Sequence, residues 1–92
     1  MTQEDLIRHG AAIERLINDQ AVQDVFEAMN EIYYKNWQTA ATPEQRELIW
    51  QKSVVLGELR QKLEQSVAVG QSELRALEIE REREALQARN QH

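Results

Sequence analysis

The chain has 92 residues, enough for one domain, and its 16 acidic and 11 basic residues give a formal net charge of −5. The absence of cysteine excludes disulfides, thiolate metal sites and a cysteine nucleophile. The acidic balance lacks the basic surface that binds a phosphate backbone, so nucleic acid is disfavoured as a partner. The sequence shows neither an apolar run of membrane-spanning length nor a signal-peptide pattern. We therefore expect a soluble cytoplasmic protein that has no membrane partner.

The first predicted helix spans about residues 3–17. Thr2 is suited to cap it, and Asp5 places negative charge in its first turn, where the helix dipole favours it. Its apolar face carries Leu6, His9, Gly10, Ile13, Leu16 and Ile17. Because His9 lies on this apolar face, we expect it to be partly buried, and a pH-sensitive contact is the alternative. His9 does not indicate a metal site, because the only other histidine is His92.

The second predicted helix spans about residues 20–38, with Asp19 as a candidate cap. Its apolar stripe consists of Val22, Val25, Phe26, Met29, Ile32, Tyr33, Trp37 and Ala40. Aromatic residues at this spacing are more often core than a ligand-stacking box, which is the alternative, whereas Tyr34 points off the stripe towards solvent or a partner. The remaining face carries Asp24, Glu27 and Glu31, which we interpret as a solvated acidic surface rather than a metal site.

The third predicted helix begins at Pro43, because Thr42, Pro43 and Gln45 form a capping box with proline at the first helical position. It runs to about residue 69. Its main stripe consists of Leu48, Ile49, Val55, Leu56, Leu59, Leu63 and Val67. Because the preceding connection is short, helices 20–38 and 43–69 should form an antiparallel hairpin.

Gly70 resembles a helix stop, so we expect a separate, charged C-terminal helix over about residues 72–89. The alternative is one helix that passes through Gly70 at a cost of about 1 kcal/mol relative to alanine. We accordingly divide the chain into a helical core, 1–70, and a charged extension, 71–92. In the extension Leu74 and Leu77 share one face and are candidate contact residues.

A second apolar face on the third helix carries Trp50, Val54 and Gly57, away from its main stripe. The first helix could cover this face. Another subunit is the main alternative, since tryptophan is enriched at the centres of protein contacts. With Tyr34, these residues are the candidate interface of the core.

The sequence contains no phosphate-binding glycine loop, no nucleophile elbow and no metalloprotease motif. We therefore expect neither an enzyme nor a cofactor. The leading hypothesis is a homo-oligomeric helical module that binds other protein chains. A nucleic-acid-associated packaging or regulatory factor is the alternative, although the acidic second helix would repel phosphate. A small-molecule domain would need a polar pocket between subunits.

The order of helix signals across residues 12–75 resembles small helical proteins of tailed bacteriophages and prophages. The resemblance is carried by the segment 18–23, by Tyr33-Tyr34 with Trp37, by Thr42-Pro43-Glu44 and by the segment 67–71. Such proteins are often encoded among head and DNA-packaging genes. The resemblance implies an assembly or accessory role, with phage structural or packaging proteins as partners and the host cytoplasm as location.

Overall fold

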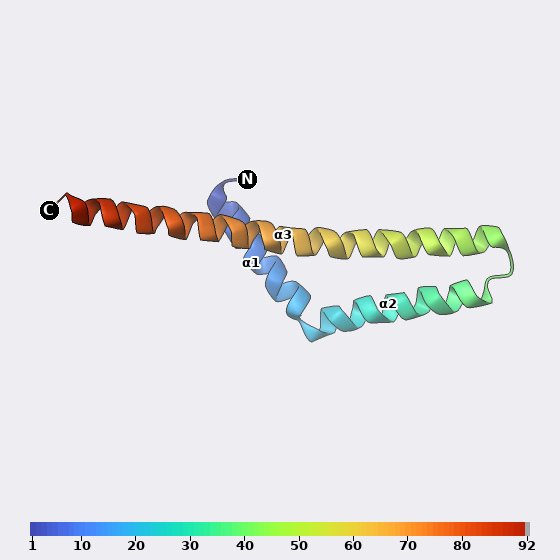
Figure 1. Cartoon of the computed structure of the whole chain (residues 1–92). Helices are drawn as coiled ribbons and strands as arrows, with labels where there is room; N and C mark the ends of the chain where they lie inside the picture. Colours follow the sequence, from blue (N-terminus) through green and yellow to red (C-terminus); the bar gives the residue numbers. More distant parts are fainter. Residues whose placement is uncertain (92) are drawn as a thin grey trace.

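The computed structural model describes residues 1–91, which form three α-helices: α1 (Gln3–Asn18), α2 (Gln20–Thr39) and α3 (Pro43–Asn90). α2 runs back along α3 as an antiparallel hairpin, and α1 crosses α3 obliquely (Figure 1). The predicted all-α fold with a hairpin core is confirmed. Across residues 1–91, none of the helices combines the length and apolar character needed to span a bilayer.

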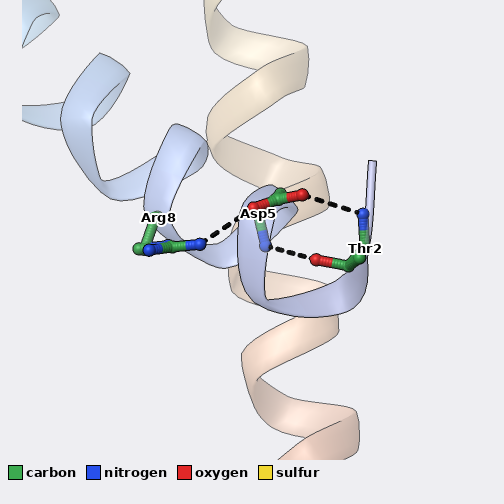
Figure 2. Close-up of polar contacts among 3 residues, drawn as sticks. All are labelled: Thr2, Asp5 and Arg8. Atoms are coloured by element: carbon green, nitrogen blue, oxygen red, sulfur yellow. Dashed lines mark hydrogen bonds and ion pairs between the residues drawn. The ribbon is translucent and has the colours of Figure 1, made fainter.

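The start of α1 is a complete capping box (Figure 2). The Thr2 hydroxyl accepts a hydrogen bond from the Asp5 backbone N–H at 3.1 Å, and the Asp5 carboxylate accepts one from the Thr2 N–H at 3.2 Å. Arg8 contacts the other oxygen of the same carboxylate at 2.9 Å. The predicted cap at Thr2 and the predicted negative charge in the first turn are both present, and the bond from the Thr2 N–H to the Asp5 carboxylate completes the box.

The other two helix starts also follow the sequence signals. The Asp19 carboxylate accepts from the Ala21 N–H at 2.8 Å, and the Thr42 hydroxyl accepts from the Gln45 N–H at 3.2 Å. The second hydrogen bond of the capping box predicted at Thr42, from the Thr42 N–H to the Gln45 side chain, is replaced by another. The Gln45 side chain accepts from the Ala41 N–H at 3.0 Å, one residue before the cap, and so fastens the loop rather than the cap.

α3 is one helix of 48 residues, so the predicted break at Gly70 and the separate helix 72–89 are wrong. A glycine that ends a helix usually adopts a left-handed conformation, and within residues 1–91 no glycine has positive φ. The helix is about 72 Å long at 1.5 Å per residue, which accounts for the 77 Å length of the molecule. Its C-terminal part projects beyond α1 as a single helix (Figure 1).

The contact between α1 and α3 is made backbone against backbone at Gly10 and Gly70. A Cβ atom built on Gly10 would lie 2.8 Å from the Gly70 Cα and 2.9 Å from the Ser66 carbonyl oxygen. A Cβ atom on Gly70 would lie 2.9 Å from the Gly10 Cα. Beside the crossing, the Gln3 side-chain amide donates to the Glu73 carboxylate at 3.3 Å. The glycine in the middle of α3 therefore serves packing, not helix termination.

The core of the described chain is small. Leu56, at 8% exposure, is its one buried large apolar side chain, and the other buried residues of 1–91 are Gly10 and Gly70. His9, predicted to be partly buried, is exposed. The reason is that α1 contacts α3 along the narrow edge centred on Gly10, which leaves His9 outside the contact.

We predict that Gly70→Ala destabilises the fold, because the added methyl group must push two backbones apart, at a cost of about 1–3 kcal/mol. Gly57→Ala is the matched control. A Cβ on Gly57 meets nothing within 4 Å, so alanine should stabilise α3 by up to about 1 kcal/mol through helix propensity. Urea denaturation followed by circular dichroism measures both. Equal stabilisation by the two substitutions would contradict the close crossing.

We predict that the cap of α1 weakens in acid. The hydrogen bond from the Thr2 backbone, then that from its hydroxyl, and then Arg8 hold the pKa of Asp5 below its ordinary value of 3.8. A carboxyl with a lowered pKa contributes stability above its unfolded-state value, and that contribution is lost as pH falls through the folded-state value. Asp5→Asn should remove this component, so the stabilities of wild type and variant should begin to converge near pH 3.8 and meet below the lowered folded-state pKa. A stability difference that persists unchanged there would refute the assignment.

Candidate functional site

One side of the N-terminal half of α3, only partly covered by α2, carries exposed apolar residues. Leu48, Val55 and Leu59 lie seven and four positions apart, so they project from one side of the helix. Each is more than half exposed, and Val55 reaches 62%. Together with Met29 and Leu56 they line an open groove of about 520 Å³ between α2 and α3. This groove is the most apolar surface of the hairpin.

α2 extends the same surface with Val25 and Ile32, which are also more than half exposed. They lie four positions before and three positions after Met29, so all three share one side of α2. We call the five exposed apolar residues on this side of the two helices the hairpin face: Val25, Ile32, Leu48, Val55 and Leu59. Exposed apolar patches are a general feature of the surfaces through which proteins contact one another.

The stripe on α3 that forms half of the hairpin face continues towards the C-terminus. Ser66, Gly70 and Glu73 follow Leu59 at steps of seven, four and three and therefore lie on the same side of α3. These are the positions that Gly10 and Gln3 of α1 contact. α1 thus covers the C-terminal half of the stripe and leaves the N-terminal half bare.

An aromatic hollow of about 360 Å³ lies on the opposite side of the hairpin. It is lined by Asn30, Tyr33, Tyr34, Trp37, Ile49, Trp50 and Ser53. Tyr33 lines both this hollow and the groove of the hairpin face, so it lies between the two sides. The predicted burial of Trp37 is wrong, since it is 44% exposed. Trp37 lies near the end of α2, where its neighbours come from the start of α3, and the Arg46 guanidinium of α3 lies 5.9 Å from its ring centroid.

The candidate interface residues of the sequence all lie at the surface or near it. Trp50 is 56% exposed, and Val54 and Gly57 are exposed on the same side of α3. α1 does not cover them, because its contacts with α3 fall near Leu63 and Gly70. The structure therefore removes the alternative in which the first helix hides this face.

The candidates of the C-terminal extension lie beyond the crossing of α1. Leu74 is exposed, and Leu77 is half-buried. The charged segment 78–84 that follows is exposed throughout. This end of α3 projects away from the hairpin instead of folding back on it (Figure 1).

The acidic residues of α2 lie on the side of the aromatic hollow. Asp24, Glu27 and Glu31 are all exposed, and the last two line a shallow polar groove with Arg60. In the part of the chain that the structure describes, no group of three potential metal ligands is close enough to hold an ion. The arrangement is that of a solvated acidic surface.

Sequence reasoning missed the hairpin face because it assigned Leu48, Val55 and Leu59 to the stripe packed against the second helix. The signal was present in the width of that stripe. At 3.6 residues per turn its seven residues span about 120° of the helix circumference, and Leu48, Val55 and Leu59 form one edge of that span, away from the buried Leu56. This edge is the part that a neighbouring helix on the Leu56 side covers least.

Comparison with known proteins gives no relative from which a role could be carried over. No family model matches the chain, and neither a curated protein nor a solved structure matches it significantly. The function must therefore be argued from the surface itself.

Proposed function

We propose that the protein is a non-enzymatic helical interaction module that works as a homo-oligomer. The observation that carries the proposal is the imbalance between its core and its surface. One large apolar side chain is buried within residues 1–91, whereas the five residues of the hairpin face are each more than half exposed. Folding must bury apolar surface to offset the loss of chain entropy, and a lone copy buries little.

The total surface supports the same conclusion. The chain exposes 7580 Å², while a compact monomer of this length would expose about 5,500 Å². Part of the excess belongs to the projecting end of α3. The whole excess, about 2,000 Å², is nevertheless within the area that each subunit of an obligate dimer buries, on the order of 1,000–2,500 Å².

A second copy is the partner that best fits the chemistry of the hairpin face. Between Val25 and Ile32 the same side of α2 carries Ala28 and Met29, which are uncharged. The α2 half of the face carries no charged residue on this side, and Lys52 is the one charged side chain that lines its groove. So few charges offer little to select a different partner, because charge complementarity is a main source of specificity. A copy presents the same patch at the same concentration, and a two-fold contact is self-complementary.

The first test is the dependence of stability on protein concentration. If folding is completed by dimerisation, a tenfold rise in concentration should stabilise the folded dimer by about 1.4 kcal/mol, and the urea midpoint should rise with it. Light scattering across the same range should show the dimer mass. A midpoint independent of concentration, with a monomer mass at high micromolar protein, would falsify the proposal.

The second test compares the two sides of the hairpin. Val55→Ser with Leu59→Ser removes apolar area from the hairpin face and should shift the dimer towards monomer by tenfold or more, measured by sedimentation. Trp50→Ala with Val54→Ala is the matched control on the side that the sequence favoured. If the control pair dissociates the protein and the hairpin-face pair does not, the contact lies at Trp50 instead.

The biological setting of the module is part of the same proposal. A role as a phage assembly or accessory factor is supported by the resemblance in the order of helix signals from Asn18 to Gln71. Binding of purified phage head and packaging proteins to the immobilised dimer tests it. Absence of binding to any of them would remove the phage assignment and leave the self-association standing.

A further inference from the structure

We infer that two copies pack hairpin face against hairpin face in opposite directions, forming an antiparallel four-helix bundle in which α3 lies along the partner's α3. The inference rests on the proposed self-association and adds its geometry. It follows from the spacing of the exposed residues on the two helices and from the place where α1 crosses α3.

On each helix, the two outermost exposed residues of the hairpin face define a midpoint. The midpoint of Leu48 and Leu59 falls between Ser53 and Val54, so a two-fold axis at that level brings each Leu48 against the partner's Leu59. Val55 has no apolar counterpart about the midpoint on α3, because its mirror position is Lys52. On α2 the midpoint of Val25 and Ile32 falls between Ala28 and Met29. An axis at that level brings Val25 against the partner's Ile32.

The two midpoints lie at the same height along the hairpin. Asn30 and Ser53 line the same hollow, and Met29 and Val55 line the same groove on the other side. One axis running across the hairpin, perpendicular to its helices, therefore satisfies α2 and α3 together. Such an axis reverses the direction of the partner, so the resulting bundle is antiparallel.

The position of α1 excludes the parallel arrangement. α1 crosses the stripe of the hairpin face at Gly70, so in a parallel dimer both copies of α1 would meet at one level and hold the hairpins apart. In the antiparallel dimer, reflection about the midpoint places Gly70 about 9 Å beyond the partner's Pro43, at the helix rise of 1.5 Å per residue. The crossing at Gly70 then lies past the start of the partner's α3, while the end of α1 near Leu63 lies level with that start. α1 therefore overlaps the partner only at this end, unlike in the parallel dimer.

Lys52 is the charged residue that lines the groove of the hairpin face. It is exposed, and its long apolar stem can lie along the contact while the ammonium group reaches solvent at the edge. The bundle therefore does not require this charge to be buried.

The arrangement has a consequence for the shape of the assembly. The two projecting ends of α3, which carry the charged segment 78–84, leave the bundle at opposite ends. From the axis to Asn90 the helix extends about 55 Å, so the dimer is a rod of about 110 Å with an exposed arm at each end. A parallel dimer would instead hold the two arms side by side.

Spin labels distinguish the two arrangements, and the natural chain has no cysteine to replace. Gln71→Cys, labelled and measured by pulsed electron resonance in the full-length dimer, should give a distance of about 50 Å between the two labels, from the helix rise. Glu58→Cys is the matched control near the axis and should give less than about 30 Å. Both positions are exposed and belong neither to the hairpin face nor to the lining of its groove, so the labels should leave the contact intact.

A long distance at position 71 with a short one at position 58 supports the antiparallel bundle. Short distances at both positions mean a parallel dimer, and long distances at both mean a contact away from the hairpin face. Either result overturns the inference while the self-association stands. A monomer mass of the unlabelled protein by light scattering, with no dipolar coupling at either site, removes the proposed function as well.

Discussion

The contact of Gly10 with Gly70 is the constraint on which the rest of the molecule depends. α1 is joined to α2 by the single residue Asp19, so the point at which α1 crosses α3 also determines where α2 begins. Because the two backbones touch, α1 lies close against α3 without large side chains between them. The hairpin that follows is therefore held at one end by its turn and at the other by this crossing.

That crossing also divides the apolar stripe of α3 into two parts with different partners. The part around Ser66 and Gly70 is satisfied within the chain, and the part from Leu48 to Leu59 is not. α2 lies to one side and leaves Val55 62% exposed. A fold that buries one large side chain has a small hydrophobic contribution to its stability, so covering the bare half matters more here than in a protein with a full core.

Much of the local structure could be predicted from the sequence, because helix caps are local. Thr2, Asp19 and Thr42 each accept the hydrogen bond that the sequence assigns to a cap, and the hairpin follows from the short connection before Pro43. Gly70 could not be assigned in the same way. A glycine within a helical pattern is consistent with a stop, a close crossing or a tolerated cost, and only the tertiary contact distinguishes them.

A non-local signal did exist for the crossing. Gly10 lies on the apolar face predicted for the first helix, and Gly70 lies on the extended stripe of the third, so each helix offers one small residue where a large one would be expected. Two such residues permit a backbone contact only if they are brought together, and a single sequence does not state which pairs meet. Gly57 shows the ambiguity, because it has nothing within 4 Å of its missing Cβ.

The surfaces that the sequence marked and the surface that the structure exposes have different roles in the antiparallel arrangement. A two-fold contact through the hairpin face is self-complementary, and it would bury Leu48, Val55 and Leu59 between the two copies. Tyr34 and Trp50 lie on the opposite side of the hairpin and remain exposed in both copies. The proposed dimer would therefore leave the aromatic hollow uncovered and would present it twice. A partner that engages both copies would gain affinity from two linked contacts.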